Sequence, residues 1–596
     1  MPKIPSFISV GNTTFRRPWR VPEGLRVLEK LLSNYDFKTN RKSSQFETEL
    51  TNNLSKSGVL DWNTSKDWGG RKFLAYCTQF GFIAPRPNNV RGETKYDLNL
   101  DGDDNNLINI LSDLTDIKME KKPFSLTPLG TLLKNTKSDG KELTAEQKDI
   151  FLRALFHHKQ PSPIQKYSSK YDGEVFYPMK LFIDIIFDLE KIKEQPFISP
   201  YEMASIINRF KTNKTNQIIK EIVEYRKNKK GKESLYAEKW YEKYKDKNVK
   251  EKFDSSYAYV DINFNAMINT GIFKRKGRKL VIKNDEKEKA KVIASFEFQY
   301  EKETSSEYLN NLWSGNLLPV EDKALLLKDT AKVFQQLKSK YDYKNIEKID
   351  ETTNENVLKN LYYENKDRFK FLEEQAYYSN QKNKGKEILS ILKDIQSRKR
   401  EININGEIIK SQPHHLEWII WRVFLAINNF IKDIKIKDTR NFPVDEDLVA
   451  EHHAISGHED MSFEFDDYVL VVEPSFKTKR QQADEWEPVY NHTLKKSKET
   501  SKTVYTVFVA PEIEINTTNF FHKPIFDDRN EFYGNIISIT IYQLERIFDS
   551  LFVNKKILTN ENFKKFLDDC LNKKNRLNAL QWHDEVNNLV DSFVNN

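Results

Sequence analysis

One segment, from Ser456 to Lys479, constrains the fold more than any other part of the chain. Its sequence is SGHEDMSFEFDDYVLVVEPSFKTK. Apolar and polar residues alternate in MSFEFDDY, and the following YVLVVE is a strongly β-forming run, so the pair predicts a hairpin with a buried second strand. The start of one hairpin strand lies beside the end of its partner. We therefore expect Asp460 and Glu473 to lie close together.

Two carboxylates at one end of a sheet suit a divalent cation. Mg²⁺ takes oxygen ligands, is held by one or two carboxylates, and keeps several waters. We expect Asp460 and Glu473 to bind Mg²⁺, with the backbone carbonyl of Pro474 as a candidate third ligand. A cation held there lowers the pKa of a bound water and offsets the charge that builds up when a phosphodiester is hydrolysed. The segment therefore predicts a nuclease site.

Neighbouring elements add further candidates to this site. Glu417 lies beside the apolar stripe of a predicted helix, HHLEWIIWRVFLAINNF, and a second predicted helix, DEWEPVYNHTLKK, contains Glu487 and His492. Either Glu487 or His492 is a candidate to orient the attacking water or to take its proton. The lysine that usually follows such an acid by two positions is absent, because Ser475 stands there. Lys477 and Lys479 lie further along and are candidates to replace it.

The cluster HHAISGHED before the hairpin raises the alternative of a zinc site. His452, His453 and His458 would be its ligands. No cysteine stands nearby, and the spacing lacks the i, i+4 pair of histidines that a helical zinc site uses. We therefore favour Mg²⁺ as the cofactor.

The chain begins with a basic aromatic arm, FRRPWR, which contains Arg16, Arg17 and Arg20. Such an arm either covers the surface of its own domain or lies along the phosphates of DNA. Amphipathic helical patterns follow it. We expect a winged-helix-like DNA-recognition domain over residues 1–140.

One helix of this first domain is the best candidate for reading DNA. The sequence SKDWGGRKFLAYCTQF, closed by Gly81, predicts a capped helix whose polar side carries Arg71, Lys72 and Gln79. Tyr76 is expected on the same side. A helix of this type after a turn fits a helix-turn-helix, and the later FSLTPLGTLL predicts a wing strand leading into another helix. A plain helical surface without DNA contact is the alternative.

Residues 141–290 repeat this order of elements, which predicts a second winged-helix-like DNA-recognition domain. Helical patterns in ISPYEMASIINRF and QIIKEIVEYRKNKKGK precede a helix that stops at Gly271, and a hairpin follows around Gly277. Basic side chains crowded on one tight turn repel each other unless they are solvated or face phosphate. The expected DNA contacts of this wing are Lys274, Arg275, Lys276 and Arg278.

The rest of the chain completes a multidomain α+β fold with a mainly helical N-terminal half. Residues 291–400 are rich in Lys, Glu, Asn, Gln and Leu, which predicts a helical linker domain. Residues 401–596 combine helices with apolar strands, which predicts an α/β sandwich around a mixed sheet.

Composition sets broad limits on the class of protein. The 596 residues include 96 basic and 88 acidic ones, and the net charge of +8 is by itself weak support for a polyanionic partner. The two cysteines, Cys77 and Cys570, lie far apart, and no apolar run reaches the length of a membrane span. We expect a cytoplasmic protein without membrane contact.

The motifs HLEWIIW, GHEDMSFEFDDYVLVVEPS, WEPVYNH and VFVAPEI together resemble the catalytic region of the AlwI-type family of type IIS restriction endonucleases, which includes nicking members. The resemblance implies a PD-(D/E)XK-like nuclease domain that uses Mg²⁺. It also implies an N-terminal half that binds a short asymmetric site in double-stranded DNA, with cleavage a few bases outside that site. By resemblance the catalytic residues are Glu417, Asp460, Glu473 and Glu487, with His492 beside them.

One nuclease centre hydrolyses one strand, so a double-strand break requires a transient homodimer or a second nuclease subunit. Two alternatives stay open. The first is a strand-specific nicking endonuclease or the large subunit of a heterodimeric restriction enzyme. The second is a non-catalytic DNA-binding regulator with a degenerate nuclease domain, which predicts salt-dependent DNA binding without strand scission.

Overall fold

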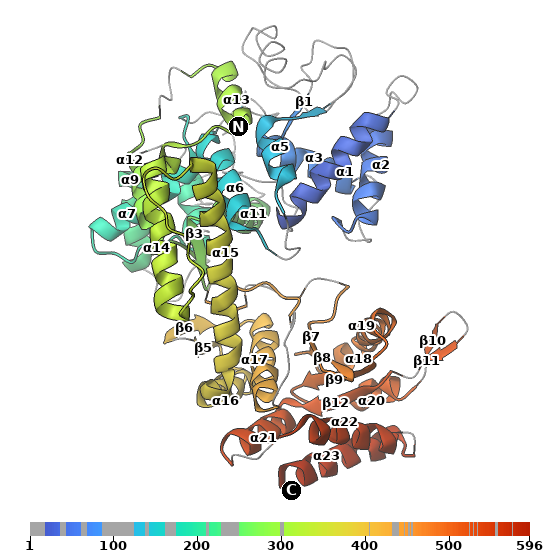
Figure 1. Ribbon diagram of the computed structural model, residues 1–596. Coiled ribbons are helices and arrows are strands. Elements are labelled where there is room, and N and C mark those ends of the chain that lie inside the picture. Colours follow the sequence, from blue (N-terminus) through green and yellow to red (C-terminus); the bar gives the residue numbers. More distant parts are fainter. Residues whose placement is uncertain are drawn as a thin grey trace. The chain divides into compact units, whose positions relative to one another are not determined.

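The computed structural model divides the chain into two compact units, Met1–Phe369 and Lys370–Asn596 (Figure 1). The finer division into four domains stays a prediction. The structure describes residues 18–35, 43–60, 68–85, 124–137, 142–160, 162, 174–209, 214–227, 249–298, 303–404, 406–431, 440–445, 447–450, 453–454, 457–523, 525–527, 530–532, 534–554, 558–574 and 576–595.

The described part of the N-terminal unit combines helices with two small antiparallel sheets. The helices are α1 (Val21–Asn34), α2 (Ser43–Lys56), α3 (Trp68–Gln79), α5 (Pro128–Asn135), α6 (Ala145–His157), α7 (Pro178–Lys191), α8 (Pro200–Ser205), α9 (Thr215–Lys227), α11 (Val249–Asn269), α12 (Lys287–Ser295), α13 (Ser305–Ser314) and α14 (Lys323–Tyr341). The sheets are β1 (Ile83–Pro85) with β2 (Phe124–Leu126), and β3 (Phe273–Lys276) with β4 (Lys279–Ile282). Helix α3 precedes the β1–β2 sheet and helix α11 precedes the β3–β4 sheet, in the order that the sequence predicts. The winged-helix character of the two regions stays a prediction.

Local sequence explains where several of these elements begin and end. The side chain of Thr127 caps α5, and Thr144 and Ser199 form capping boxes at α6 and α8. Gly271 and Gly277 adopt φ angles of +77° and +58°, which L residues with a side chain rarely take. They end α11 and turn the β3–β4 hairpin where the sequence predicts these changes.

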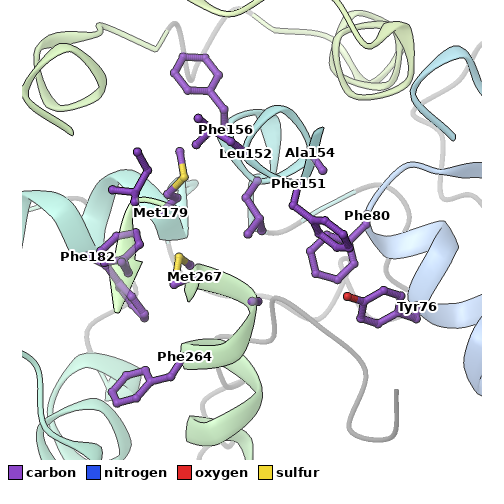
Figure 2. Packing of buried hydrophobic residues seen from close by; sticks show 14 of the residues in the cluster. Tyr76, Phe80, Phe151, Leu152, Ala154, Phe156, Met179, Phe182, Phe264 and Met267 are labelled. Atoms are coloured by element: carbon purple, nitrogen blue, oxygen red, sulfur yellow. The ribbon is translucent and has the colours of Figure 1, made fainter. Parts of the chain in front are cut away.

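One hydrophobic core runs through the N-terminal unit, from Val21 in α1 to Val320. Figure 2 shows Tyr76 and Phe80 beside Phe151 of α6; the ring centroids of Tyr76 and Phe80 are 4.6 Å apart, and those of Phe80 and Phe151 are 5.5 Å apart. The expectation that Tyr76 lies on the polar side of α3 is wrong, because its ring is buried against these two phenylalanines. A buried ring at this position adds apolar area to the core.

The C-terminal unit is built around a sheet of four strands in the order β12, β9, β8, β7, in which β7 is antiparallel to β8 and the other neighbours are parallel. Its strands are β5 (Glu401–Ile404), β6 (Glu407–Lys410), β7 (Met461–Glu464), β8 (Tyr468–Pro474), β9 (Thr503–Ala510), β10 (Ile525–Asp527), β11 (Asn530–Phe532) and β12 (Ile536–Thr540). Its helices are α16 (Gly385–Gln396), α17 (His414–Phe430), α18 (Lys479–Ala483), α19 (Trp486–Glu499), α20 (Ile515–Phe521), α21 (Ile541–Phe552), α22 (Asn560–Lys574) and α23 (Ala579–Asn595). Helix α15 (Glu355–Asn380) contains the boundary between the two units.

Helices pack on both faces of the four-stranded sheet. Leu470 and Val472 of β8 belong to the core formed with α16, α17, α21 and α22. Because side chains alternate along a strand, Val471 and Glu473 point to the opposite face. On that face Phe508, the neighbour of Glu473 in β9, packs with residues of α19 and α20. A mixed sheet between helices agrees with the expectation from the sequence. Among the described residues, no helix is both long enough and apolar enough to span a membrane.

Candidate active site

The β7–β8 hairpin brings the two predicted metal ligands together. In its register Met461 pairs with Val472, so Asp460 and Glu473, the next residues outward, lie opposite each other at one end of the sheet. Glu473 is 6% exposed, and Asp460 is half-buried. Pro474, the candidate third ligand, is the last residue of β8. The hairpin pattern therefore predicts the neighbourhood of the two acids, while their role as metal ligands stays a prediction.

The negative charges of this pair oppose each other. Burial, followed by the charge of Glu473, raises the pKa of Asp460 well above its ordinary value. Burial and the charge of Glu459 raise the pKa of Glu473, and a hydrogen bond from the backbone of Asp460 partly counteracts this shift. Like charges in a poorly solvated site destabilise each other, and a bound divalent cation removes that repulsion. The pair is therefore a candidate cation site.

The donor set fits Mg²⁺. Within the part of the chain that the structure describes, no group of three or more His, Cys, Asp or Glu side chains is arranged to hold a metal ion. Mg²⁺ does not require such a group, because it takes one or two carboxylates and completes its coordination with water and phosphate oxygens. Asp460 and Glu473 supply those carboxylates.

The histidines considered for zinc have other neighbours. Nδ1 of His453 contacts the carboxylate of Glu417, and Nδ1 of His458 lies 3.4 Å from Nζ of Lys495. His452 lies outside the described residues. A zinc site needs three or four converging protein ligands. The described histidines do not converge in this way.

Glu417 is held at the start of α17 by the segment that precedes the hairpin. Its Oε2 accepts a hydrogen bond of 3.0 Å from the backbone N–H of Ala454, and its Oε1 contacts His453. Glu417 is 6% exposed. Its charge contributes to the raised pKa values of Asp460 and Glu473, so it lies within electrostatic reach of both acids.

Helix α19 and the residue before it place polar side chains near the acid pair. Glu485, immediately before the helix, shares one helical face with His492 and Lys496. Nδ1 of His492 is 2.9 Å from Oε1 of Glu473, and burial lowers the pKa of His492, which favours the neutral imidazole. Nζ of Lys496 is 2.8 Å from Oε1 of Glu459. An acid, an imidazole and an ammonium group thus approach the sheet end from one helix.

Glu485 and the motif residue Glu487 have different surroundings. Glu485 is among the charges that raise the pKa values of Asp460 and Glu473, and it forms an ion pair with Lys477. The side chain of Glu487 is exposed in the first turn of α19. The catalytic role of Glu487 stays a prediction, whereas the charge of Glu485, the residue before the helix, contributes to the raised pKa values of the pair.

Sequence reasoning did not select Glu459, Glu485 or Lys496. The spacing of Glu485, His492 and Lys496 on one helical face was a usable signal, because these positions recur at the period of an α-helix. The pairing of Glu459 with Lys496 had no such signal, since it depends on where α19 packs against the sheet.

The basic residues of the predicted wing differ in their surroundings. Arg275 is 5% exposed; its Nη1 lies 3.1 Å from Asp261, and its Nη2 donates a hydrogen bond of 2.9 Å to Asn265. Arg275 is therefore part of the contact between β3 and α11. The remaining three are Lys274, which is half-buried, and Lys276 and Arg278, which are exposed.

The other DNA-contact candidates lie near the start of the chain. Those on α3 have half-buried side chains and are Arg71, Lys72 and Gln79. Arg20 forms a 2.8 Å ion pair with Glu23 and donates a hydrogen bond to the carbonyl of Ser57. Arg16 and Arg17 lie outside the described residues. DNA contact by all of these residues stays a prediction.

Comparison with known protein families places the chain among the restriction endonucleases. Residues 81–547 match the model of the AlwI restriction endonuclease family. Because this match covers most of the chain, the protein belongs to that family, as its motifs indicate.

One solved structure that is similar to part of the chain is the small subunit of the heterodimeric restriction endonuclease R.BspD6I. The two chains share 21% sequence identity with a TM-score of 0.27, and the match covers 35% of this chain and 98% of that chain. No curated protein sequence matches the chain significantly.

Proposed function

We propose that this protein is a Mg²⁺-dependent type IIS restriction endonuclease. It binds a short asymmetric site in double-stranded DNA and hydrolyses phosphodiester bonds a few bases outside that site. Membership of a restriction endonuclease family supports DNA cleavage. The observation that carries the location of the chemistry is the meeting of Asp460 and Glu473 at one end of the β7–β8 hairpin.

In this proposal Asp460 and Glu473 hold the metal, with the carbonyl of Pro474 beside them. Mg²⁺ held by these residues would lower the pKa of a bound water and offset the negative charge of the phosphate. Burial lowers the pKa of His492, and in the tautomer with the proton on Nδ1 this group donates to Glu473. Its Nε2 is then an acceptor, so His492 both orients Glu473 and can take a proton.

Two further acids complete the proposed centre. Glu417 is fixed at both carboxylate oxygens by the segment before the hairpin, which suits an orienting role. We assign to Glu485 the role that motif comparison gives to Glu487, because the charge of Glu485 acts on both Asp460 and Glu473.

The N-terminal part is the proposed site of sequence recognition, through two winged-helix-like regions, residues 1–140 and 141–290, joined to the nuclease domain by residues 291–400. Side chains of α3 are the candidates for contacts to base edges, which carry sequence information. Exposed basic residues of the β3–β4 wing are candidates for contacts to phosphates, which add affinity without sequence selectivity.

A second candidate function is cleavage of one strand only. It is favoured by the acid pair itself, since one pair per chain in the described residues provides one hydrolytic centre. The protein would then act as a nicking endonuclease or as the large subunit of a heterodimeric enzyme, whereas a transient homodimer would cut both strands.

Incubation of supercoiled plasmid with the protein and Mg²⁺ tests these proposals. Linear product supports double-strand cleavage, nicked circles support cleavage of one strand, and unchanged plasmid supports the non-catalytic regulator. The Asp460→Ala variant is the control, and product at the wild-type rate from this variant would contradict the assigned centre. Sequencing of the product ends gives the recognition site and the cleavage offset.

A further inference from the structure

Helix α19 brings a lysine to the acid cluster from a place that the sequence motifs do not predict. Ser475 stands where a lysine commonly follows the second acid, and Lys477, the next lysine along the chain, pairs with Glu485. Lys496 instead pairs with Glu459 at 2.8 Å, and their side chains are 23% and 7% exposed. This ion pair is mostly shielded from water, so it is stronger than a surface pair.

Glu459 needs this partner because of where it lies. It directly precedes Asp460, and after burial its charge is among the causes that raise the pKa of both Asp460 and Glu473. Its other side-chain partner, the hydroxyl of Ser462 at 3.2 Å, is neutral. A buried carboxylate without a cation is costly and either takes a proton or moves.

The backbone around Glu459 ties this side chain to the position of Asp460. Nδ2 of Asn441 donates a hydrogen bond of 2.7 Å to the carbonyl of Glu459, and the backbone N–H of Asn441 donates one of 3.0 Å to the carbonyl of Asp460. Lys496 and Ser462 hold the side chain of Glu459, while Asn441 holds the backbone of both residues. A movement of Glu459 would therefore displace its neighbour Asp460.

We propose that Lys496 is a positioning residue of the nuclease centre that acts through Glu459. The ammonium group of Lys496 compensates the carboxylate of Glu459, so that a divalent cation would have only the neighbouring acid pair to balance. Without Lys496, Glu459 turns toward the acid pair, disturbs Asp460 and repels the phosphate of DNA. The inference rests on the proposed nuclease function and adds a positioning residue to it.

The test is a pair of variants that separates an action through Glu459 from a direct action on DNA. Lys496→Met is expected to lower kcat for plasmid cleavage about 30-fold with less than about a threefold change in KM, because positioning affects the chemical step. Adding Glu459→Gln to Lys496→Met removes the uncompensated charge and is expected to restore kcat to within about threefold of the wild type. Lys496→Arg, which keeps the ion pair, is expected to retain most of the activity.

Lys498→Met is the matched control, because it removes the same charge from an exposed position of the same helix. It is expected to cleave at the wild-type rate. The inference is contradicted if Lys496→Met also cleaves at that rate, or if the double variant is as slow as Lys496→Met, which would mean that Lys496 acts on DNA directly. A wild-type protein that does not cleave in Mg²⁺ contradicts the proposed function itself, so the two failures are distinguishable.

Discussion

The hairpins β3–β4 and β7–β8 both concentrate side chains of one charge, but they differ in how their buried charges are compensated. In β3–β4 the buried member, Arg275, forms an ion pair with Asp261 of its own unit and donates a hydrogen bond to Asn265. In β7–β8 the acids Asp460 and Glu473 lie side by side, and burial together with neighbouring carboxylates raises the pKa of both. Internal neutralisation is what stability favours, whereas retained repulsion in a buried site is typical of a site that binds a ligand.

The largest expected effect comes from removing one acid of the β7–β8 hairpin. Glu473→Gln keeps the shape of the side chain and removes its charge, so the proposed cation loses a ligand. We expect plasmid cleavage in Mg²⁺ to fall by at least about 10³-fold, which corresponds to roughly 4 kcal/mol of transition-state stabilisation. Measurement of initial cleavage rates checks this expectation.

The same variant, Glu473→Gln, also tests whether repulsion within the acid pair lowers the stability of the protein. Because Glu473→Gln relieves repulsion with Asp460, we expect the metal-free C-terminal unit to melt about 2–4 °C higher than the wild type in EDTA. Calorimetry in EDTA measures this change. A lower melting temperature, together with unchanged cleavage, would mean that Glu473 is an ordinary structural residue.

A smaller effect distinguishes the two acids at the start of α19. Glu485 acts on the acid pair, whereas Glu487 is exposed. We expect Glu485→Gln to lower the cleavage rate at least about tenfold more than Glu487→Gln, because only the former lies within electrostatic reach of the pair. Parallel cleavage assays measure the ratio of the two rates. A larger loss of rate in Glu487→Gln than in Glu485→Gln would support Glu487 as the catalytic acid.

Removing the buried charge of the basic hairpin β3–β4 is expected to destabilise the protein, whereas removing an acid from β7–β8 is expected to stabilise it. Arg275→Ala removes a buried guanidinium and its hydrogen bonds to α11, so we expect the N-terminal unit to lose about 2 kcal/mol of unfolding free energy. Denaturant unfolding of the whole chain, followed with a probe in that unit, measures this loss. A variant as stable as the wild type would contradict this structural role of Arg275.

The smallest expected effect is that of the exposed wing residue Arg278. Arg278→Ala leaves the fold intact and removes one candidate phosphate contact. We expect DNA binding, measured with Ca²⁺ in place of Mg²⁺, to weaken a few-fold and the slope of log affinity against log salt to fall by about one. An unchanged salt dependence would remove Arg278 from the DNA interface.

The same two hairpins show how far the sequence predicts this protein. The meeting of Asp460 with Glu473 is predictable, because a hairpin register is set by residues close together in the chain. The burial of Arg275 is not, because it depends on the packing of α11 against β3. The same holds for Tyr76, whose helical position predicts a polar face but whose ring meets Phe151 of α6.

In the candidate active site too, residues linked by local contacts are predictable from the sequence, and those linked by distant contacts are not. Motifs around the hairpin lead to its acids and to His492, which contacts Glu473. They do not lead to Lys496, because its contact with Glu459 joins elements that are separate in the sequence. Residues that touch the candidate site only through tertiary packing are therefore the ones that pattern reasoning misses.

The most direct test of metal binding by Asp460 and Glu473 is a crystal structure of the protein with DNA and Mn²⁺, which replaces Mg²⁺ and scatters anomalously. We expect an anomalous peak within about 2.5 Å of a carboxylate oxygen of Asp460 and of one from Glu473. A peak held by other side chains, with these two carboxylates free, would contradict it.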